Sequence, residues 1–401
     1  MTEGMLAILA GLASAEAAAA TLVAWLRPGC KWLITTRDLD PPIDRAGLDR
    51  FLEHGWDADL GWVRKPGTTH RETGQGGIIT SYTIGADGAR HNLNFDNQPV
   101  KVTVWGDSYA FARQVNDDET WSHGLSQALA GNVQNFGVGN YGLDQALLRL
   151  DRDWRQTPLA IMAVVPETIS RCLSVWKHFS EYGNIFAFKP RFHLSNHRLH
   201  LMPNPIRTPE DFLRIGELLP SLKRDDVFWK RKFKPDLLGF PWSLRLLARP
   251  QRHLPLIAAA LADRIVGGEH AFTQIMQRNI TLTASLYREA EPVDLLEALC
   301  LRFRDQAYER GARAIVVMLP QLLDLARIRA GDHYYAPFLR RLANHMPVAD
   351  MAPALLATGD ERPLYIHDSY GGHLSALGNK IIADTLAPLC RVLATDSPLG
   401  I

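Results

Sequence analysis

Ser108 stands where a strand-like run ends and a new pattern begins. Val102 to Trp105 are β-forming residues, and in VWGDSYAFARQV (104–115) a Gly-Asp-Ser triplet leads directly into a helix-like pattern. A serine at the carboxyl end of a buried strand, followed by a helix, is one place where an α/β protein exposes a nucleophile at the edge of its sheet. Taken alone, the triplet is more typical of a turn or a helix N-cap.

Four sequence blocks, taken in chain order, resemble those of the SGNH or GDSL hydrolase family. They are GDSY (106–109), NFGVGNYG (135–142), VVPETISR (164–171) and HDSYGGHLSALGN (367–379). The resemblance covers residues 101–175 and 310–390. It implies a three-layer α/β/α, flavodoxin-like parallel sheet and a serine hydrolase of the bacterial, large-insertion type.

The chemistry that the resemblance implies needs a nucleophile, a base and a group that orients the base. Ser108 would attack a carbonyl carbon, and His373, at the start of the last predicted helix, would act as general base and then general acid. The family usually places an aspartate two or three residues before this histidine, but Tyr370 and Gly371 occupy those positions here. We therefore expect Asp368, the nearest preceding carboxylate, to orient His373.

The family builds its oxyanion hole from the serine N–H, a glycine N–H of the second block and an asparagine side chain of the third. Gly137 fits the second position, where a glycine also allows tight packing. Thr168 stands where the asparagine would be, and its hydroxyl is a shorter donor than an amide. Because loss of one such donor lowers turnover by about 100-fold or more, we consider Asn140 as an alternative source of the hydrogen bond.

The elements that must position these residues begin at Lys101. Strands and helices alternate over 101–165, and ARAIVVMLP (312–320) and MPVADM (346–351) predict two further strands before a terminal amphipathic helix. Such alternation predicts an α/β fold with a parallel sheet and crossover helices. Residues 101–401 form the SGNH-like domain in this interpretation.

Two segments lie outside this alternation. Residues 1–100 read as an N-terminal extension, with an apolar helix followed by irregular and β structure. Residues 176–265 read as a helical insertion that also contains a hairpin, RFHLSNHRLHL (191–201), with its turn near Ser195 and Asn196.

The composition excludes several classes of function. The 401 residues include 44 Lys or Arg and 43 Asp or Glu, and the formal charge of +1 gives no global field for a nucleic acid. The four cysteines are scattered, without the paired spacing of a zinc site or a disulfide framework. We therefore predict no nucleic-acid partner, no metal and no cofactor.

Two segments suggest contact with a membrane. Met5–Leu26 is apolar over about the length that spans a bilayer, although Glu16 interrupts it and basic residues follow rather than precede it, against the order of an export signal. Residues 223–253 hold nine Lys or Arg and three Asp among aromatic residues, a composition suited to an amphipathic lid or an anionic surface. The sequence favours a cytoplasmic location. Three roles stay open for Met5–Leu26, namely a helix packed on the body of the protein, a membrane anchor and a cleaved signal, and the basic aromatic segment is a second candidate for membrane association.

The function predicted from the sequence is that of an esterase that removes an O-acyl group, such as acetyl, from a polar conjugate. Segments 56–67 and 82–90 resemble the leader region of large bacterial SGNH proteins of surface-polysaccharide pathways, which favours a small-molecule or glycan ester as substrate. Two alternatives stay open. One is an O-acyltransferase that uses the same residues, and the other is a binding or scaffold protein that kept the fold without catalysis. The oligomeric state is not predicted.

Overall fold

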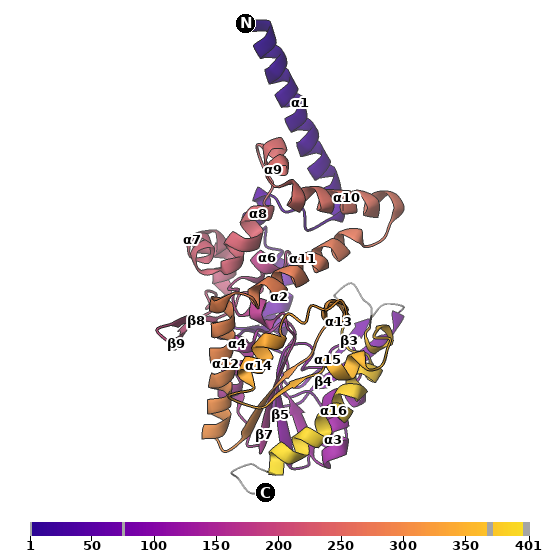
Figure 1. The fold of residues 1–401 in the computed structure, drawn as a ribbon. Coiled ribbons are helices and arrows are strands. Elements are labelled where there is room, and N and C mark those ends of the chain that lie inside the picture. The colour runs from indigo at the N-terminus through magenta and orange to yellow at the C-terminus, as the bar shows by residue number, and fades with distance from the viewer. Residues whose placement is uncertain (1, 74–76, 367–371, 396–401) are drawn as a thin grey trace. The chain divides into compact units, whose positions relative to one another are not determined.

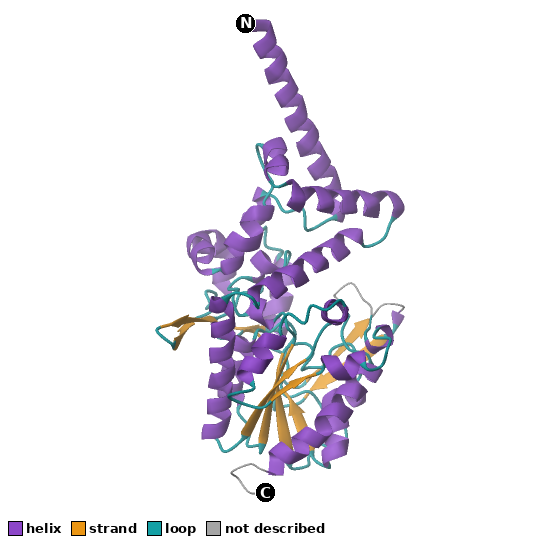
Figure 2. Cartoon of the chain, viewed as in Figure 1, coloured by secondary structure: helices purple, strands orange, loops and turns teal. Residues whose placement is uncertain are grey.

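The structure is a computed structural model that describes residues 2–73, 77–366 and 372–395. The chain divides into two compact units, which we call the helical unit and the sheet unit (Figures 1 and 2). The helical unit comprises Met1–Phe51, Ser174–Phe188 and Pro205–Asn279, and the sheet unit comprises Leu52–Leu173, Lys189–Asn204 and Ile280–Ile401. Of the predicted insertion, residues 189–204 therefore belong to the sheet unit and the remainder to the helical unit.

A parallel sheet of five strands forms the centre of the sheet unit, in the order β11-β10-β7-β5-β6. The strand bounds are β5 Val100–Gly106, β6 Asn132–Asn135, β7 Leu159–Val164, β10 Arg313–Met318 and β11 Val348–Asp350. Every residue of β7 is buried, as is typical of a central parallel strand with helices on both faces. The predicted α/β class with a parallel sheet is confirmed.

Helices cover the two faces of this sheet (Figure 1). On one face pack α3 (Trp121–Leu129) and α16 (Ala376–Thr395), and on the other pack α4 (Leu143–Asp153) and α12 (Ala290–Glu309). Val102 and Val104 of β5 join Ile382 and Leu386 of α16 in one buried apolar cluster. This packing joins the strand that precedes Ser108 to the helix that follows His373.

The sheet unit also contains shorter elements. The helices are α5 Thr168–Arg171, α13 Leu322–Arg329, α14 Ala336–Leu342 and α15 Ala352–Leu356. Two antiparallel pairs precede the sheet, namely β1 Trp56–Asp57 with β2 Gly61–Trp62, and β3 Thr68–Thr73 with β4 Ile79–Ile84.

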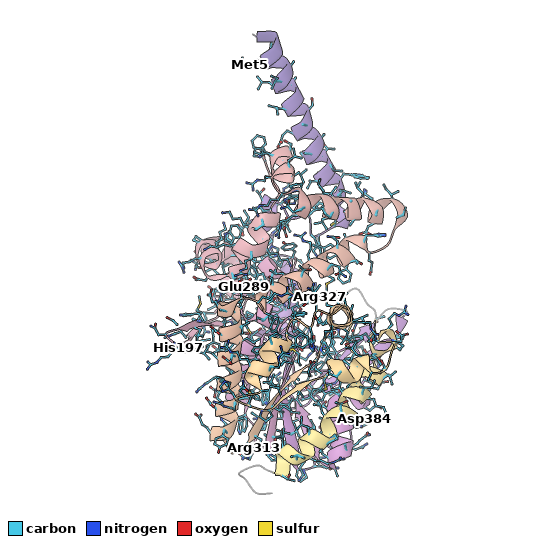
Figure 3. All side chains as sticks on the ribbon, in the orientation of Figure 1. Met5, His197, Glu289, Arg313, Arg327 and Asp384 are labelled. Atoms are coloured by element: carbon cyan, nitrogen blue, oxygen red, sulfur yellow. The ribbon has the colours of Figure 1, made fainter. Side chains whose placement is uncertain are left out.

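The predicted hairpin is confirmed as β8 (Arg191–Ser195) paired with β9 (Arg198–Met202). Its turn is formed by Asn196 and His197, whose φ angles are 49° and 58°, and His197 lies at the tip in Figure 3. Two positive φ angles are what a two-residue turn needs to match the twist of its strands. The turn is therefore one residue later than the sequence indicated.

The helical unit consists of helices with a small core of its own. The helices are α1 Thr2–Leu26, α2 Arg45–His54, α6 Lys177–Ser180, α7 Ile215–Asp225, α8 Lys234–Asp236, α9 Trp242–Ala248, α10 Pro250–Val266 and α11 His270–Leu286. Of α2 and α11, only the residues up to Phe51 and Asn279 belong to this unit. Val23 and Leu26 of α1 pack with Leu246 of α9 and Leu256 of α10. Residues from the N-terminal extension and from the insertion therefore share one core.

Candidate active site

Gly106 ends β5 so that Ser108 lies at the carboxyl edge of the sheet. Its φ is 144°, and a Cβ at this position would lie 1.8 Å from the carbonyl oxygen of Ala163 on β7. Only glycine fits both this backbone conformation and this close approach of two strands. Glycine is thus needed at the first position of this block for the turn that contains Ser108.

Asp107 holds the turn that contains Ser108. Its fully buried carboxylate accepts hydrogen bonds from the N–H groups of Tyr109 (2.8 Å) and Val165 (3.0 Å) and from the Arg171 guanidinium (3.2 Å). These contacts tie the end of β5 to the end of β7 and to the third block. Asp107 is therefore a structural residue of the site.

The residues after Ser108 form turns rather than the helix that their pattern indicated, and α3 begins only at Trp121. The buried Arg90 side chain donates to the carbonyl oxygens of Phe111, Ala112 and Val115. In a helix such carbonyls accept from N–H groups four residues later. Here the Arg90 guanidinium replaces those N–H groups as donor. Gln114 adopts a φ of 71° within this loop.

Ser108 and His373 meet at this edge, although 265 positions separate them in the chain. The Oγ atom of Ser108 lies 2.9 Å from Nε2 of His373. On the other side of the ring, Oε1 of Gln114 lies 2.8 Å from Nδ1 of His373 and accepts the backbone N–H of the same residue at 3.3 Å. A backbone N–H only donates, so the Gln114 atom is a carbonyl oxygen and Nδ1 carries the ring proton. Nε2 is then the acceptor for the Ser108 hydroxyl proton.

The loop that carries His373 is anchored on both sides. The Tyr109 hydroxyl donates to the carbonyl oxygen of Gly372 at 2.6 Å, and the N–H of Ile366 donates to the carbonyl oxygen of His373 at 2.8 Å. Asn379, from the fourth block, accepts the N–H of Trp121 and donates to the carbonyl oxygen of Leu374. The asparagine of this block thus holds α16 against α3.

Burial keeps the His373 imidazole neutral. Ser108 is 4% exposed and His373 is 6% exposed. Burial in the first place, and then the charges of Arg113, Arg171 and Arg64, lower the pKa of His373 from 6.5 to about 3. The neutral ring is the form that accepts a proton, but the same surroundings make its protonated form less stable.

Gln114 is the site residue that sequence reasoning missed. Asp368, the predicted orienting carboxylate, lies outside the described residues. Gln114 lies six residues after Ser108, in a stretch whose pattern indicates a helix. Its side chain reaches His373 only because this stretch forms a loop in the structure. The polar side chain inside that stretch was the only local signal.

Gly137 packs directly on the turn that contains Ser108. A Cβ at this position would lie 2.4 Å from the backbone nitrogen of Phe111, so the second block approaches the first as closely as backbones allow. Its N–H donates to Oδ1 of Asn135 at 2.9 Å. The N–H that was expected to bind an oxyanion is therefore engaged within the loop of the second block.

Thr168 and Asn140 lie in different surroundings. Thr168 is fully buried, and its Oγ1 accepts the N–H of Leu143 at 3.0 Å, which joins the third block to the start of α4. Asn140 is half-buried with a φ of 65°. Within the described part of the chain, neither the Asn140 amide nor the Ser108 N–H has a hydrogen-bond partner.

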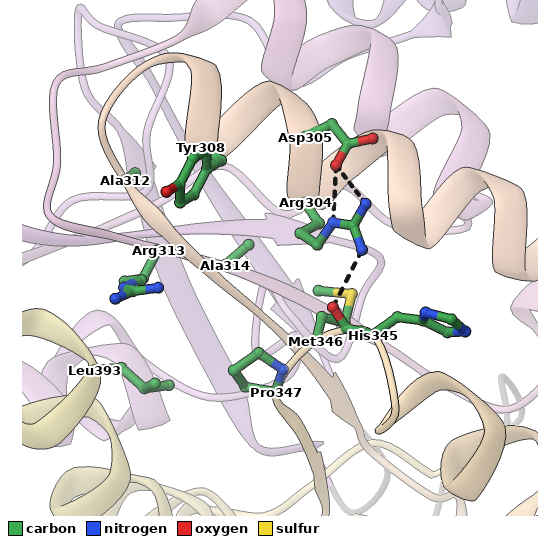
Figure 4. Close-up of a pocket in the computed structure, with 10 residues that line it drawn as sticks. All are labelled: Arg304, Asp305, Tyr308, Ala312, Arg313, Ala314, His345, Met346, Pro347 and Leu393. Carbon is green, nitrogen blue, oxygen red and sulfur yellow. Dashed lines mark hydrogen bonds and ion pairs between the residues drawn. The ribbon is translucent and has the colours of Figure 1, made fainter. Parts of the chain in front are cut away.

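In residues 2–73, 77–366 and 372–395, no group of three or more His, Cys, Asp or Glu side chains is placed to hold a metal ion. A cavity of about 460 Å³ lies at the opposite edge of the sheet (Figure 4). Arg313 and Ala314 at the start of β10 and Pro347 before β11 line it. Because the strands are parallel, this edge is the one away from Ser108, and we assign the cavity no part in its chemistry.

Comparisons with known proteins give a distant likeness in fold. No family model and no curated protein matches the chain. One similar solved structure is a protein assigned to the G-D-S-L family of lipolytic proteins, from Desulfitobacterium hafniense DCB-2, with 12% identity, 72% of this chain and 98% of that chain covered, and a TM-score of 0.33. Another is an alpha/beta hydrolase enzyme from the metagenome of Lake Arreo, Spain, with 11% identity, coverage of 76% and 99%, and a TM-score of 0.33. Scores this low carry no information on function.

The lowered pKa of His373 predicts that Ser108 stays reactive in acid. The ring remains neutral down to about pH 3, whereas a histidine of pKa about 6.5 loses roughly 30-fold of its neutral form by about pH 5. We expect the rate constant for labelling of Ser108 by a fluorophosphonate to be nearly constant between about pH 7.5 and about pH 5. A half-maximal rate near pH 6.5 would contradict this expectation.

Circular dichroism must accompany that experiment, because acid also destabilises the fold. An unfolded His373 takes up a proton below its ordinary pKa of about 6.5, whereas the folded chain does so only near pH 3. The unfolded state therefore binds more protons between these values, and this residue lowers the free energy of unfolding progressively as the pH falls through that range.

Two substitutions of Gln114 separate its role as a hydrogen-bond acceptor from the effect of a negative charge at the same place. Gln114→Ala removes the acceptor at Nδ1, and we expect the labelling rate to fall by about 100-fold or more. Gln114→Glu places a carboxylate at Nδ1, which stabilises the protonated ring and moves the acid limb of the pH profile upward toward pH 6.5. Gln98→Ala, at an exposed glutamine, is the control. An unchanged pH profile in Gln114→Glu would show that Gln114 does not face the working imidazole.

Proposed function

We propose that the chain is an SGNH-type serine hydrolase that removes an O-acyl group from a polar conjugate such as a sugar. The observation that carries this proposal is the hydrogen bond of 2.9 Å between Ser108 Oγ and His373 Nε2 at the carboxyl edge of a parallel sheet. The orientation of His373 by Gln114 supports it, because Nδ1–H is fixed and Nε2 is left to accept a proton. A nucleophile and an oriented base are the parts that acyl transfer needs.

The proposed reaction has two halves. In the first, His373 Nε2 takes the hydroxyl proton as Ser108 Oγ attacks the ester carbonyl carbon, and the proton then passes to the leaving alcohol as the carbon–oxygen bond breaks. In the second, His373 removes a proton from water, the hydroxide oxygen attacks the acyl carbon, and the proton returns to Ser108 as the acid leaves. The covalent intermediate is an acyl ester of Ser108.

The oxyanion of each tetrahedral intermediate needs N–H donors. We assign this role to the Ser108 N–H and the Asn140 side-chain amide, because both lack other hydrogen-bond partners within the described residues. Gly137 and Thr168 instead support the first and third blocks through the contacts given above.

In this proposal Gln114 takes the role that we expected of Asp368, because its carbonyl oxygen already accepts the Nδ1–H of His373. An amide oxygen fixes the tautomer as a carboxylate would, but it brings no charge to stabilise the protonated ring. We therefore expect a slower enzyme than one with a charged orienting group.

Ser108→Ala tests the proposed function directly. We expect the folded wild type to be labelled by a fluorophosphonate and to hydrolyse para-nitrophenyl acetate, and the variant to lose labelling and at least about 1,000-fold in hydrolysis. Ser195→Ala, at the exposed last residue of β8, should behave as wild type. Absence of labelling in the folded wild type would favour the scaffold alternative. Appearance of an acetylated sugar when a sugar acceptor is added would favour the acyltransferase.

A further inference from the structure

Arg64 lies where the first and second blocks meet. Its guanidinium carbon is 3.9 Å from the ring centroid of Phe111, in the loop after Ser108, and 4.5 Å from that of Tyr82. Its Nη2 atom lies 3.9 Å from the place a Cβ would occupy on Gly139, in the loop of the second block. The side chain thus packs against two aromatic rings that contact each other edge to face, beside the loop that carries Asn140.

Among the described residues, Arg64 differs from Arg113 and Arg171 in having no ion pair of its own. Arg113 pairs with Glu72, and Arg171 pairs with Glu167. Arg64 donates from Nη1 to the Tyr82 hydroxyl, but within the described residues it makes no ion pair, and its buried Nε has no hydrogen-bond partner. Nε and Nη2 form one edge of the guanidinium, with two parallel N–H groups in the arrangement that binds a carboxylate or a phosphate.

We propose that the Nε and Nη2 edge of Arg64 binds an oxyanion group of the ester substrate, such as a carboxylate or a phosphate. This inference rests on the proposed hydrolase function and names the chemical class of its substrate. An arginine stays protonated even when buried. The charge of Glu72 acts on Arg64, but Glu72 is paired with Arg113, and no described carboxylate forms an ion pair with Arg64 itself.

A bound anion would also raise the pKa of His373, the proposed base. The charge of Arg64 contributes to lowering the pKa of His373, after burial, Arg113 and Arg171. A substrate anion on Arg64 offsets that charge, so the His373 ring accepts the Ser108 proton more readily when the substrate is bound. The substrate thus supplies part of the negative charge that Gln114 lacks.

The test compares anionic esters with their neutral methyl esters. On the acyl side the pair is para-nitrophenyl hydrogen adipate and its methyl ester, and on the alcohol side it is para-acetoxybenzoate and its methyl ester. We expect wild type to prefer one anionic ester, and Arg64→Gln to lower kcat/KM for that ester by about 10- to 100-fold with little change for the neutral one. Arg71→Gln removes the same charge from an exposed site on β3 and should match wild type.

Equal kcat/KM of wild type for charged and neutral esters, or an equal loss for both in Arg64→Gln, would overturn the inference. Calorimetry with adipate alone separates this result from a failure of the proposed hydrolase. Adipate binding that Arg64→Gln abolishes supports the anion site even if no ester is turned over. An absence of adipate binding in a chain without turnover overturns both.

A second inference concerns the helical unit, where the first half of α1 exposes a row of large apolar side chains. Met5, Leu6, Ile8, Leu9 and Leu12 are each 56–65% exposed, and Met5 is labelled in Figure 3. The stretch Gly4–Gly29 has a mean hydropathy of 1.8 and is long enough to cross a membrane, with 11% of its apolar window buried. Such an exposed apolar surface is typical of contact with a partner or a lipid.

Glu16 marks the point where α1 joins the rest of the helical unit. Its carboxylate accepts the N–H groups of Trp242 and Ser243 and the hydroxyl of Ser243, which satisfies donors at the start of α9. The charge inside the apolar stretch therefore has a structural role. Beside it, Phe240, Leu244 and Leu247 are 62–76% exposed.

We infer that the first half of α1 lies in the interface of an anionic lipid bilayer and buries its exposed apolar side chains there. A full crossing would carry Glu16 and α9 into hydrocarbon, which is costly for the charge. Exposed Arg245 and Arg249 on or next to α9 favour anionic lipid over an apolar protein surface.

Vesicle flotation with the full chain tests this inference. We expect flotation with phosphatidylglycerol-containing vesicles, less with phosphatidylcholine alone, and at least about tenfold weaker binding in Leu6→Glu/Leu9→Glu. Leu201→Glu, at an exposed apolar residue of β9, should float as wild type. A chain that stays with the soluble fraction, or a double variant that floats unchanged, would show that lipid is not the partner.

Discussion

The hydrogen bond between Ser108 and His373 is the contact on which the proposed chemistry depends. It exists because the carboxyl ends of parallel strands meet at one edge of the sheet, where β5 delivers the serine. Glycine at the strand end and a buried aspartate shape the turn, and the Tyr109 hydroxyl holds the backbone beside His373. Residues of the first block therefore fix the position of the fourth.

The site differs from the pattern that its sequence resembles in the electrostatics of the base. A neutral amide oxygen at Nδ1 fixes the tautomer of His373, while burial and nearby arginines work against a charged ring. The geometry is thus ready for proton transfer, but the charge that usually stabilises the imidazolium is missing from the described residues. An anionic substrate on Arg64 would compensate for part of this deficit, because opposite charges near a titrating group offset one another.

The helical unit is built from segments that are far apart in the sequence. The sequence predicts an extension for the first helix and an insertion for the segment that contains α9 and α10. In the structure, however, Val23 and Leu256 belong to one apolar core. Each helix carries only part of an apolar surface. Which surfaces meet depends on packing between distant segments, which helical periodicity does not specify.

The sequence by itself determined the alternation of strands and helices, the β8–β9 hairpin, and the two residue types, serine and histidine, that could share a proton. The alternation and the hairpin follow from local periodicity, whereas the pairing of serine with histidine follows from the resemblance of the four blocks to a known family. Tertiary structure decided the rest. Arg90 donates to carbonyl oxygens that would accept helical N–H groups if a helix followed Ser108. Gln114 accepts the Nδ1–H of His373, and Asn135 accepts the N–H of Gly137. The reason is that each of these donors or acceptors has several chemically adequate partners, and only the folded backbone brings one of them within hydrogen-bond distance.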